Sequence, residues 1–138
     1  MPVRAQYADD RGSMAVEIVV LIPALLMVLL LVVAFGRYVS AEGDVQAITR
    51  DAVRAATLER DPASALAAAQ GVATASIPAS TTCQPITLSG AFVAGGTLSA
   101  TLDCEVSWSG LGFIGLSGTA HVRATSAAPL DTYRRTGA

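Results

Sequence analysis

The sequence has no lysine, one histidine and two cysteines, so the side chains that most often carry out chemistry are scarce. We expect His121 on the polar face of a strand, and no Cys–His or Ser–His–Asp arrangement can be drawn around it. The two cysteines have no histidine or acidic neighbours at zinc-ligand spacing. The glycines between positions 110 and 118 do not match a phosphate-binding loop. We therefore expect no catalytic residue, no metal and no cofactor.

Charge is scarce as well. Only 14% of the residues are charged, and nine arginines stand against eleven acidic residues without forming a basic cluster. A nucleic-acid-binding surface needs such a cluster, so we exclude nucleic acid as a partner. The 138 residues allow one small domain once a membrane span and a leader are subtracted, which leaves no room for a conventional enzyme.

What the sequence does contain is a long uncharged run, Ile18 to Gly36. These 19 residues would rise roughly 28 Å as a helix, close to the hydrocarbon thickness of a bilayer. Pro23 within the run is tolerated in membrane helices and predicts a mild kink. Arg37 and Tyr38 follow, where interfacial anchors belong. The run therefore predicts a transmembrane helix, which we bound at residues 13–38, and a lipid bilayer as its partner.

A glycine and a glutamate precede this span at a fixed distance. Gly12 follows Arg11, and the carboxylate of Glu17 stands five residues later, directly before the apolar run. This order resembles the processing site of type IV pilin precursors. Glycine suits the cut bond because it has no Cβ to obstruct a protease at the membrane face. Cleavage after Gly12 would make Ser13 the new N-terminus, and residues 1–12 would be a leader peptide.

The resemblance can be narrowed, because the first third of the chain is similar to the N-terminal signature of TadE-like proteins, the minor pilin-like components of tight-adherence (type IVb) pilus systems. The matching features are Arg11-Gly12, Ala15-Val16-Glu17, Pro23, Phe35-Gly36-Arg37 and the Ala/Arg-rich helix that follows. The resemblance implies a non-enzymatic pseudopilin that acts in pilus assembly. Its implied partners are a prepilin peptidase, other pilins or pseudopilins and membrane proteins of pilus assembly. It also implies a single-pass protein of the inner or plasma membrane, with a cytoplasmic N-terminus and an extracytoplasmic C-terminal domain.

Glu17 has two interpretations. A carboxylate at the edge of a bilayer costs about 1 to 3 kcal/mol depending on depth, so membrane helices rarely keep one without a use. After cleavage the α-amine of Ser13 would lie one helical turn away, and it could also reach the carboxylate of a neighbouring subunit. We expect Glu17 and Ser13 to set the register between subunits. The alternative is that Glu17 merely begins the helix at the headgroups, where the helix dipole favours an anion.

Beyond the span the pattern becomes amphipathic. A stripe of small and apolar residues predicts that the helix continues to about Arg60, giving a rod of about 70 Å; it comprises Ala41, Val45, Ile48, Ala52 and Ala55. This stripe either covers the chain's own β-domain or packs against neighbouring subunits, and both can hold on different faces. Asp61-Pro62 predicts the start of a second helix, with Asp as its N-cap, that reaches about Ala75 and is interrupted by Gly71.

From Ile77 the composition shifts to Ser, Thr, Gly and Pro, which predicts a β-domain over residues 77–128 after a helical part over residues 39–76. We expect strands over Pro85–Val93, Thr97–Trp108 and about Thr119–Ser126, with a turn at Gly95-Gly96. The central strand places one residue in two on an apolar face, namely Leu98, Ala100, Leu102, Cys104, Val106 and Trp108. The predicted fold class is α+β, a meander of about three antiparallel strands on the long helix, ending in a flexible tail at 129–138.

Cys83 and Cys104 are expected to form a disulfide if their side of the membrane is extracytoplasmic. The bridge would close a loop of about 20 residues and contribute on the order of 3 kcal/mol. In an antiparallel pair of strands, the numbers of facing residues add to a constant sum, the register sum. Pairing residue 83 with residue 104 makes this sum odd, whereas the apolar face of the strands requires an even sum. Cys83 must therefore lie off the regular ladder or at a bulge.

Two rival interpretations remain open. Residues 1–41 could be an ordinary signal peptide of a secreted surface protein, cut after Val39-Ser40-Ala41, although its apolar run exceeds the usual 7 to 15 residues. The chain could also be a signal-anchored binding module that is never processed.

In the glycine-rich loop from Ser109 to Gly118, the apolar residues Phe113, Ile114 and Leu116 either anchor the loop or mark a contact.

Overall fold

The computed structural model describes residues 11–107, 115 and 118–133, with the backbone alone for residues 11–14. Trp108, the apolar residues of the following loop and the end of the predicted tail lie outside the described residues. The chain divides into two compact units, Met1–Gly36 and Arg37–Ala138. The first contains the apolar part of helix α1, and the second contains the folded head.

Helix α1 runs from Arg11 to Leu58 and has Pro23 inside it. Within the first unit its large apolar side chains are exposed, for example Val19 at 70% and Met27 at 69%. The predicted end at about Arg60 is confirmed to within two residues, since Glu59 begins the short connection to the next helix. The long N-terminal helix of the expected fold class is therefore present.

In the second unit, α1 buries one side against the sheet. The stripe is wider than predicted, because Thr49, Val53 and Ala56 are buried together with Val45, Ile48 and Ala52. Thr49 is accommodated because its hydroxyl donates a hydrogen bond to the Val45 carbonyl oxygen at 2.7 Å. The stripe covers the chain's own β-domain, as one of the two interpretations held.

Helix α2 spans Pro62–Ser76 and begins as the sequence predicts. Asp61 is the N-cap, and its Oδ1 accepts hydrogen bonds from the backbone N–H groups of Ala63 at 3.1 Å and Ser64 at 2.9 Å. Its other oxygen accepts one from the Ser64 hydroxyl at 2.6 Å. The prediction that Gly71 interrupts the helix is wrong, because the 15-residue helix passes through it. A single glycine lowers helix stability by only about 1 kcal/mol, which packing of the alanine face outweighs.

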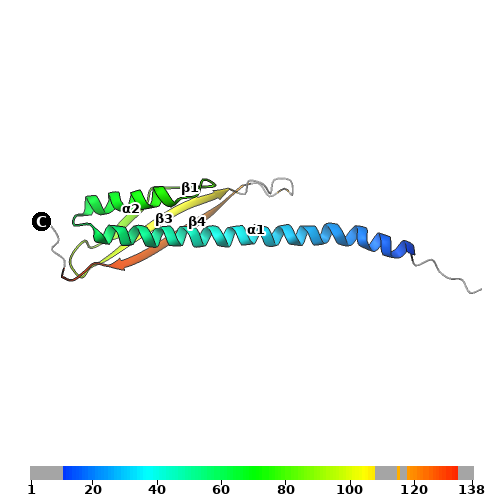
Figure 1. Ribbon diagram of the computed structural model, residues 1–138, viewed down its shortest axis with the longest axis horizontal. Helices are drawn as coiled ribbons and strands as arrows, with labels where there is room; N and C mark the ends of the chain where they lie inside the picture. Colours follow the sequence, from blue (N-terminus) through cyan, green and yellow to red (C-terminus); the bar gives the residue numbers. More distant parts are fainter. Residues whose placement is uncertain (1–10, 108–114, 116–117, 134–138) are drawn as a thin grey trace, which may run out of the picture. The chain divides into compact units, whose positions relative to one another are not determined.

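Among the described residues the sheet has four strands, of which Figure 1 labels β1, β3 and β4. β3 (Thr97–Ser107) is central and pairs along its whole length with β4 (Thr119–Pro129). Its other edge is occupied by two short strands in succession, β1 (Thr81–Cys83) and β2 (Thr87–Gly90), and all pairs are antiparallel. The α+β fold with a small antiparallel sheet is confirmed. The strand predicted over Pro85–Val93 is shorter than expected, and β1 was not predicted.

A one-residue bulge separates β1 from β2. Cys83 pairs with Cys104 at a register sum of 187, whereas Thr87 pairs with Thr101 at 188. Three residues between β1 and β2 (84–86) therefore face two residues of β3 (102–103). The Gln84 N–H donates to the Asp103 carbonyl oxygen at 2.8 Å within this bulge. This bulge reconciles the odd register sum of the cysteine pair with the even sum of the apolar face. Cys83 itself pairs regularly with Cys104, and the bulge follows directly after it.

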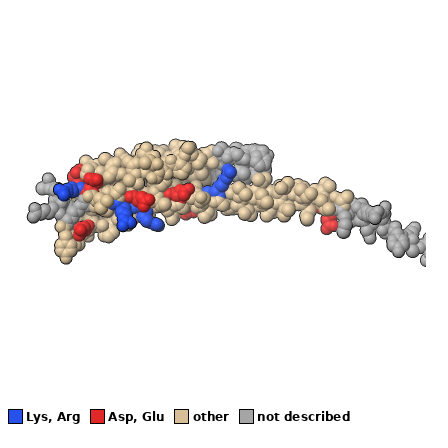
Figure 2. Space-filling view, in the orientation of Figure 1, with Lys and Arg blue, Asp and Glu red and all other residues tan. Residues whose placement is uncertain are grey.

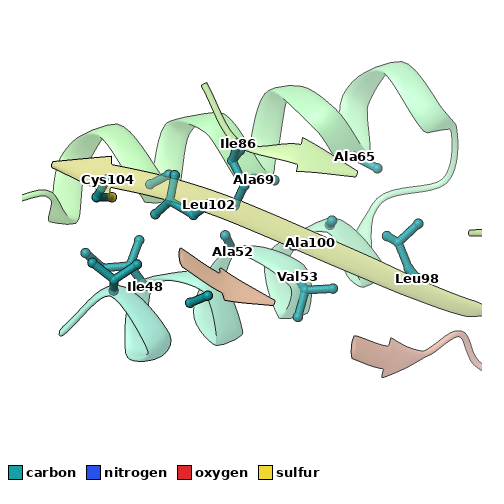
Figure 3. Close-up of a cluster of buried hydrophobic side chains, with 14 of the residues drawn as sticks. Ile48, Ala52, Val53, Ala65, Ala69, Ile86, Leu98, Ala100, Leu102 and Cys104 are labelled. Carbon is teal, nitrogen blue, oxygen red and sulfur yellow. The ribbon is translucent and has the colours of Figure 1, made fainter. Parts of the chain in front are cut away.

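Both helices lie on one face of the sheet and enclose a single core (Figures 1 and 3). Figure 3 shows side chains of α1, α2 and β3 converging, with alanines of α2 facing the strand and Leu102 between the two helices. The predicted inward positions of β3 are confirmed from Leu98 to Cys104, which are at most 4% exposed. Alanine dominates the helix side, so the two helices approach the sheet closely.

The other face of the sheet is polar and open. Arg123 Nε contacts Asp103 Oδ1 at 2.7 Å, and the hydroxyls of Thr101 and Thr125 lie 3.1 Å apart. At the end of the sheet, the turn before β3 has Gly95 at φ +74°, a conformation that glycine adopts without strain. β4 ends at Pro129, three residues beyond the predicted end of the strand at about Ser126. Leu130 is buried, and its N–H donates a hydrogen bond to the Gly96 carbonyl oxygen at 2.8 Å.

Candidate functional site

The residues predicted for processing all fall in the first turns of α1. Gly12 and Ser13 lie within its bounds, and Glu17 follows one helical turn after Ser13, about 6 Å along the axis. Glu17 is exposed. Among the residues whose side chains the structure describes, none forms a hydrogen bond or ion pair with it. Residues four apart lie on the same side of a helix, so the backbone positions of Ser13 and Glu17 share one side of α1.

An apolar surface extends along α1 beyond Glu17. From Ile18 to Gly36 the helix has no charged residue, and Figure 2 shows this part of its surface without blue or red atoms. Apolar side chains on all sides of a helix are stable only when lipid or other helices cover them. The helix is long and apolar enough to cross a membrane, and it is the one such helix among the described residues. The chain thus has a candidate membrane anchor near its N-terminus.

Cys83 and Cys104 form a disulfide across the ladder between β1 and β3. Cys104 is 3% exposed and belongs to the core, whereas Cys83 is partly buried at its edge. The bridge fixes the short strand β1, which has only three residues to pair with β3. Sequence reasoning anticipated the bond and missed the strand, because Thr81–Cys83 is too short for an alternating pattern.

Most of the charged residues on the strands of the head lie on the open face of the sheet. Asp103 and Glu105 on β3 face Arg123 and His121 on β4, and His121 Nδ1 lies 3.6 Å from Glu105 Oε1. The hydrogen bond and charge of Asp103 raise the pKa of Arg123. All four side chains are substantially exposed, so water screens their charges. Among the described residues, no group of three acidic, histidine or cysteine side chains could hold a metal ion. The arrangement is that of a solvated surface.

A depression that sequence reasoning missed lies between α2 and β2. It has a volume of about 520 Å³, and its lining includes Leu66, Ile86, Leu88 and Phe92. None of the described residues that line it is charged. Its only sequence signal is the absence of charge from Pro62 to Ser76, which is uncommon for a surface helix.

Comparison with known proteins finds a match over the N-terminal segment. Residues 12–54 match the family model described as TadE-like protein. No curated protein and no solved structure matches the chain. The matched segment begins at Gly12, contains Ser13 and Glu17, and continues through the apolar helix into the buried stripe of the head. Over residues 12–54, less than half of the chain, the protein is similar to the TadE-like family, and it has a candidate membrane anchor near its N-terminus.

Proposed function

We propose that this protein is a membrane-anchored, pilin-like component of a tight-adherence pilus, processed by a prepilin peptidase and acting in pilus assembly. The observation that carries the proposal is the coincidence of two features in one helix. The TadE-like match covers residues 12–54, and the same helix exposes an uncharged apolar surface after Glu17. TadE-like proteins belong to pilus systems, and an exposed apolar helix can pack either with lipid or with the helices of other subunits.

The mechanism is structural. In the membrane the apolar part of α1 holds the subunit, with its N-terminus in the cytoplasm and the head outside. Cleavage after Gly12 gives Ser13 a free amine about 6 Å along the axis from Glu17. At about 4 Å such charges attract by about 1 kcal/mol in water and about 4 kcal/mol at an effective dielectric of 20, so packing among helices strengthens the pair. The pair then fixes the axial offset between neighbouring subunits, which contact one another and membrane proteins of pilus assembly.

The direct test is the intact mass of the protein extracted from membranes of cells that carry the pilus system. The pilin-like function predicts a chain that begins at Ser13. A chain that begins at Glu42 would identify a secreted protein with a signal peptide, and an uncut chain would identify a signal-anchored binding module. The head itself does not distinguish these alternatives, because the buried residues of its core cluster all follow Glu42.

Replacing the glycine before the cut tests the position of cleavage. Gly12→Leu places a branched side chain at the bond that the peptidase must approach, so we expect the precursor to stay at full length. Gly36→Leu is a matched control, because nothing lies within 4 Å of a Cβ at that position of the same helix. We expect that variant to be cut normally. Normal maturation of Gly12→Leu would show that the assignment of the site is wrong.

Removing the charge of Glu17 tests the pairing of subunits. Glu17→Gln keeps the size of the side chain and removes its attraction for an amine, so we expect normal membrane insertion but weak cross-linking to neighbouring pilins. In a strain that lacks the native protein, the variant should fail to restore pili. Piliation at the level of the parent would leave Glu17 as a helix-end anion at the headgroups and exclude the pairing role.

A further inference from the structure

The outer side of β2 has backbone groups without a partner in the sheet. Among the described residues β2 pairs only with β3, through Thr87 with Thr101 and Ser89 with Ser99 on either side of Leu88. Backbone groups of successive strand residues point to opposite edges. The Asp103 carbonyl oxygen accepts from Gln84, so the odd-numbered residues of β3 face this lane. Thr87 and Ser89 therefore bond to β3, and the N–H groups of Leu88 and Gly90 point outward.

The apolar groove between α2 and β2 lies along the same edge. Leu66 on α2 is 38% exposed beside it, and Leu88 and Phe92 are only partly buried on its other wall. The volume of the groove, about 520 Å³, has room for an apolar side chain, and no described lining residue has a charge to pair with a buried ion. An ionised side chain would lose its hydration there without compensation. The groove thus favours an uncharged, apolar occupant.

We propose that the edge of β2 and this groove together bind an extended, uncharged segment of a partner protein. The segment adds a strand beside β2, where its backbone pairs with the outward groups of Leu88 and Gly90. One of its apolar side chains then lies between α2 and β2. This surface is distinct from the apolar helix and from Glu17, and the inference does not require that the chain is processed.

The partner is a single strand of another protein and not the sheet of a second copy. Three strand lanes are about 14 Å wide at 4.8 Å per lane, whereas the two helices above them need about 16 to 20 Å. A second copy that offered β4 would bring its own two-helix layer into the space beside α2. A strand without a covering helix meets no such obstacle. The edge of β1 is a poorer site, because the bulge and Pro85 interrupt the lane between it and β2.

Hydrogen exchange of single amides tests the inference on the full chain in lipid nanodiscs. The probe is an end-blocked, uncharged peptide, Ser-Thr-Ala-Thr-Leu-Thr-Ala, whose apolar residues alternate with polar ones. We expect millimolar peptide to slow exchange at Leu88 and Gly90, and to leave Thr87 and Ser89 unchanged because β3 already bonds them. The same peptide N-methylated along its backbone should give no protection. With aspartate in place of its leucine, binding should weaken about tenfold or more.

A pair of variants on α2 supplies the matched control. Leu66→Glu places a charge on the wall of the groove and should weaken peptide binding about tenfold or more. Ala67→Glu places the same charge on the next residue, which is exposed and outside the groove, and should bind as the parent does. No protection of Leu88 and Gly90, or equal binding of the N-methylated peptide, would overturn the inference. So would protection that appears without peptide and grows with protein concentration, because a second copy would then be the occupant.

Discussion

Breaking the disulfide should reveal how much the head depends on it. Cys83 and Cys104 are 21 residues apart in sequence. The chain-entropy relation gives about 11 cal/mol/K for a loop of this length, or about 3.3 kcal/mol at 25 °C. A domain of about 100 residues loses about 4 to 8 °C in melting temperature per kcal/mol, so the loss should be roughly 13 to 26 °C.

The variant of choice is Cys83→Ala, because Cys83 lies at the edge of the core and its truncation leaves little space unfilled. Thermal unfolding of the full chain in detergent micelles, followed by circular dichroism, measures the effect on the head. The double variant with Cys104→Ala adds the loss of a side chain that is 3% exposed and should melt lower still.

Reduction of the parent protein separates the cross-link from packing. The reduced parent keeps both sulfur atoms, so it should melt close to Cys83→Ala, while reductant should leave that variant unchanged. A loss below about 4 °C in the reduced parent would refute the entropic reasoning. In that case the pairing of β1 with β3 would already restrict the loop without the bond.

Two further predictions concern the core and the cap of α2. Leu102 is fully buried at the centre of the sheet, so Leu102→Ala should lower the free energy of unfolding by about 2 to 5 kcal/mol in urea, against less than about 0.5 kcal/mol for Val93→Ala at a half-exposed position. The hydrogen bonds from Ser64 and Ala63 lower the pKa of Asp61 below its ordinary value of 3.8. The ionised side chain therefore stabilises the folded head at pH values above 3.8. This stabilisation is lost as the pH falls through the lowered pKa. Asp61→Asn keeps the cap but not the charge, so the difference in urea midpoint between parent and variant should shrink from pH 6 to pH 3, and a constant difference would contradict the assignment.

The features that sequence reasoning predicted correctly rest on local chemistry. The alternation from Leu98 to Cys104 needs only the two-residue period of a strand, and it is buried as drawn. Asp61 before Pro62 combines an N-cap with a proline that has no N–H to lose, and α2 begins there. In such cases the residues that determine the structure are neighbours in sequence, so no knowledge of the packing is required.

The parity of the cysteines gave a non-local prediction without any structure. Pairing residue 83 with residue 104 conflicts with the register of the apolar face, so the sequence predicted that Cys83 lies off the regular ladder or at a bulge. The structure places the bulge within residues 84–86, directly after Cys83. The existence of β1 itself was missed, because three residues have no period and pair only when β3 supplies the other side.

The width of the buried stripe on α1 could not be read from the sequence either. Thr49 looked polar, but its hydroxyl bonds to the carbonyl oxygen one turn earlier and so can be buried. Val53 and Ala56 are buried because the sheet covers more than one row of the helix. The groove beside β2 depends on where α2 lies over the sheet, which no pattern along the chain specifies.

The two parts of α1 are under different constraints, and this separates what the fold explains from what it does not. After Arg37, one side of the helix is buried against the sheet, whereas Val39 and Leu58 stay exposed. Before it, most of the large apolar side chains are exposed, and no described side chain pairs with Glu17. An uncharged helix surface with one carboxylate at its start is costly unless lipid or another molecule covers it. We therefore expect lipid or another molecule to cover this part, and the family match extends across both parts of the helix.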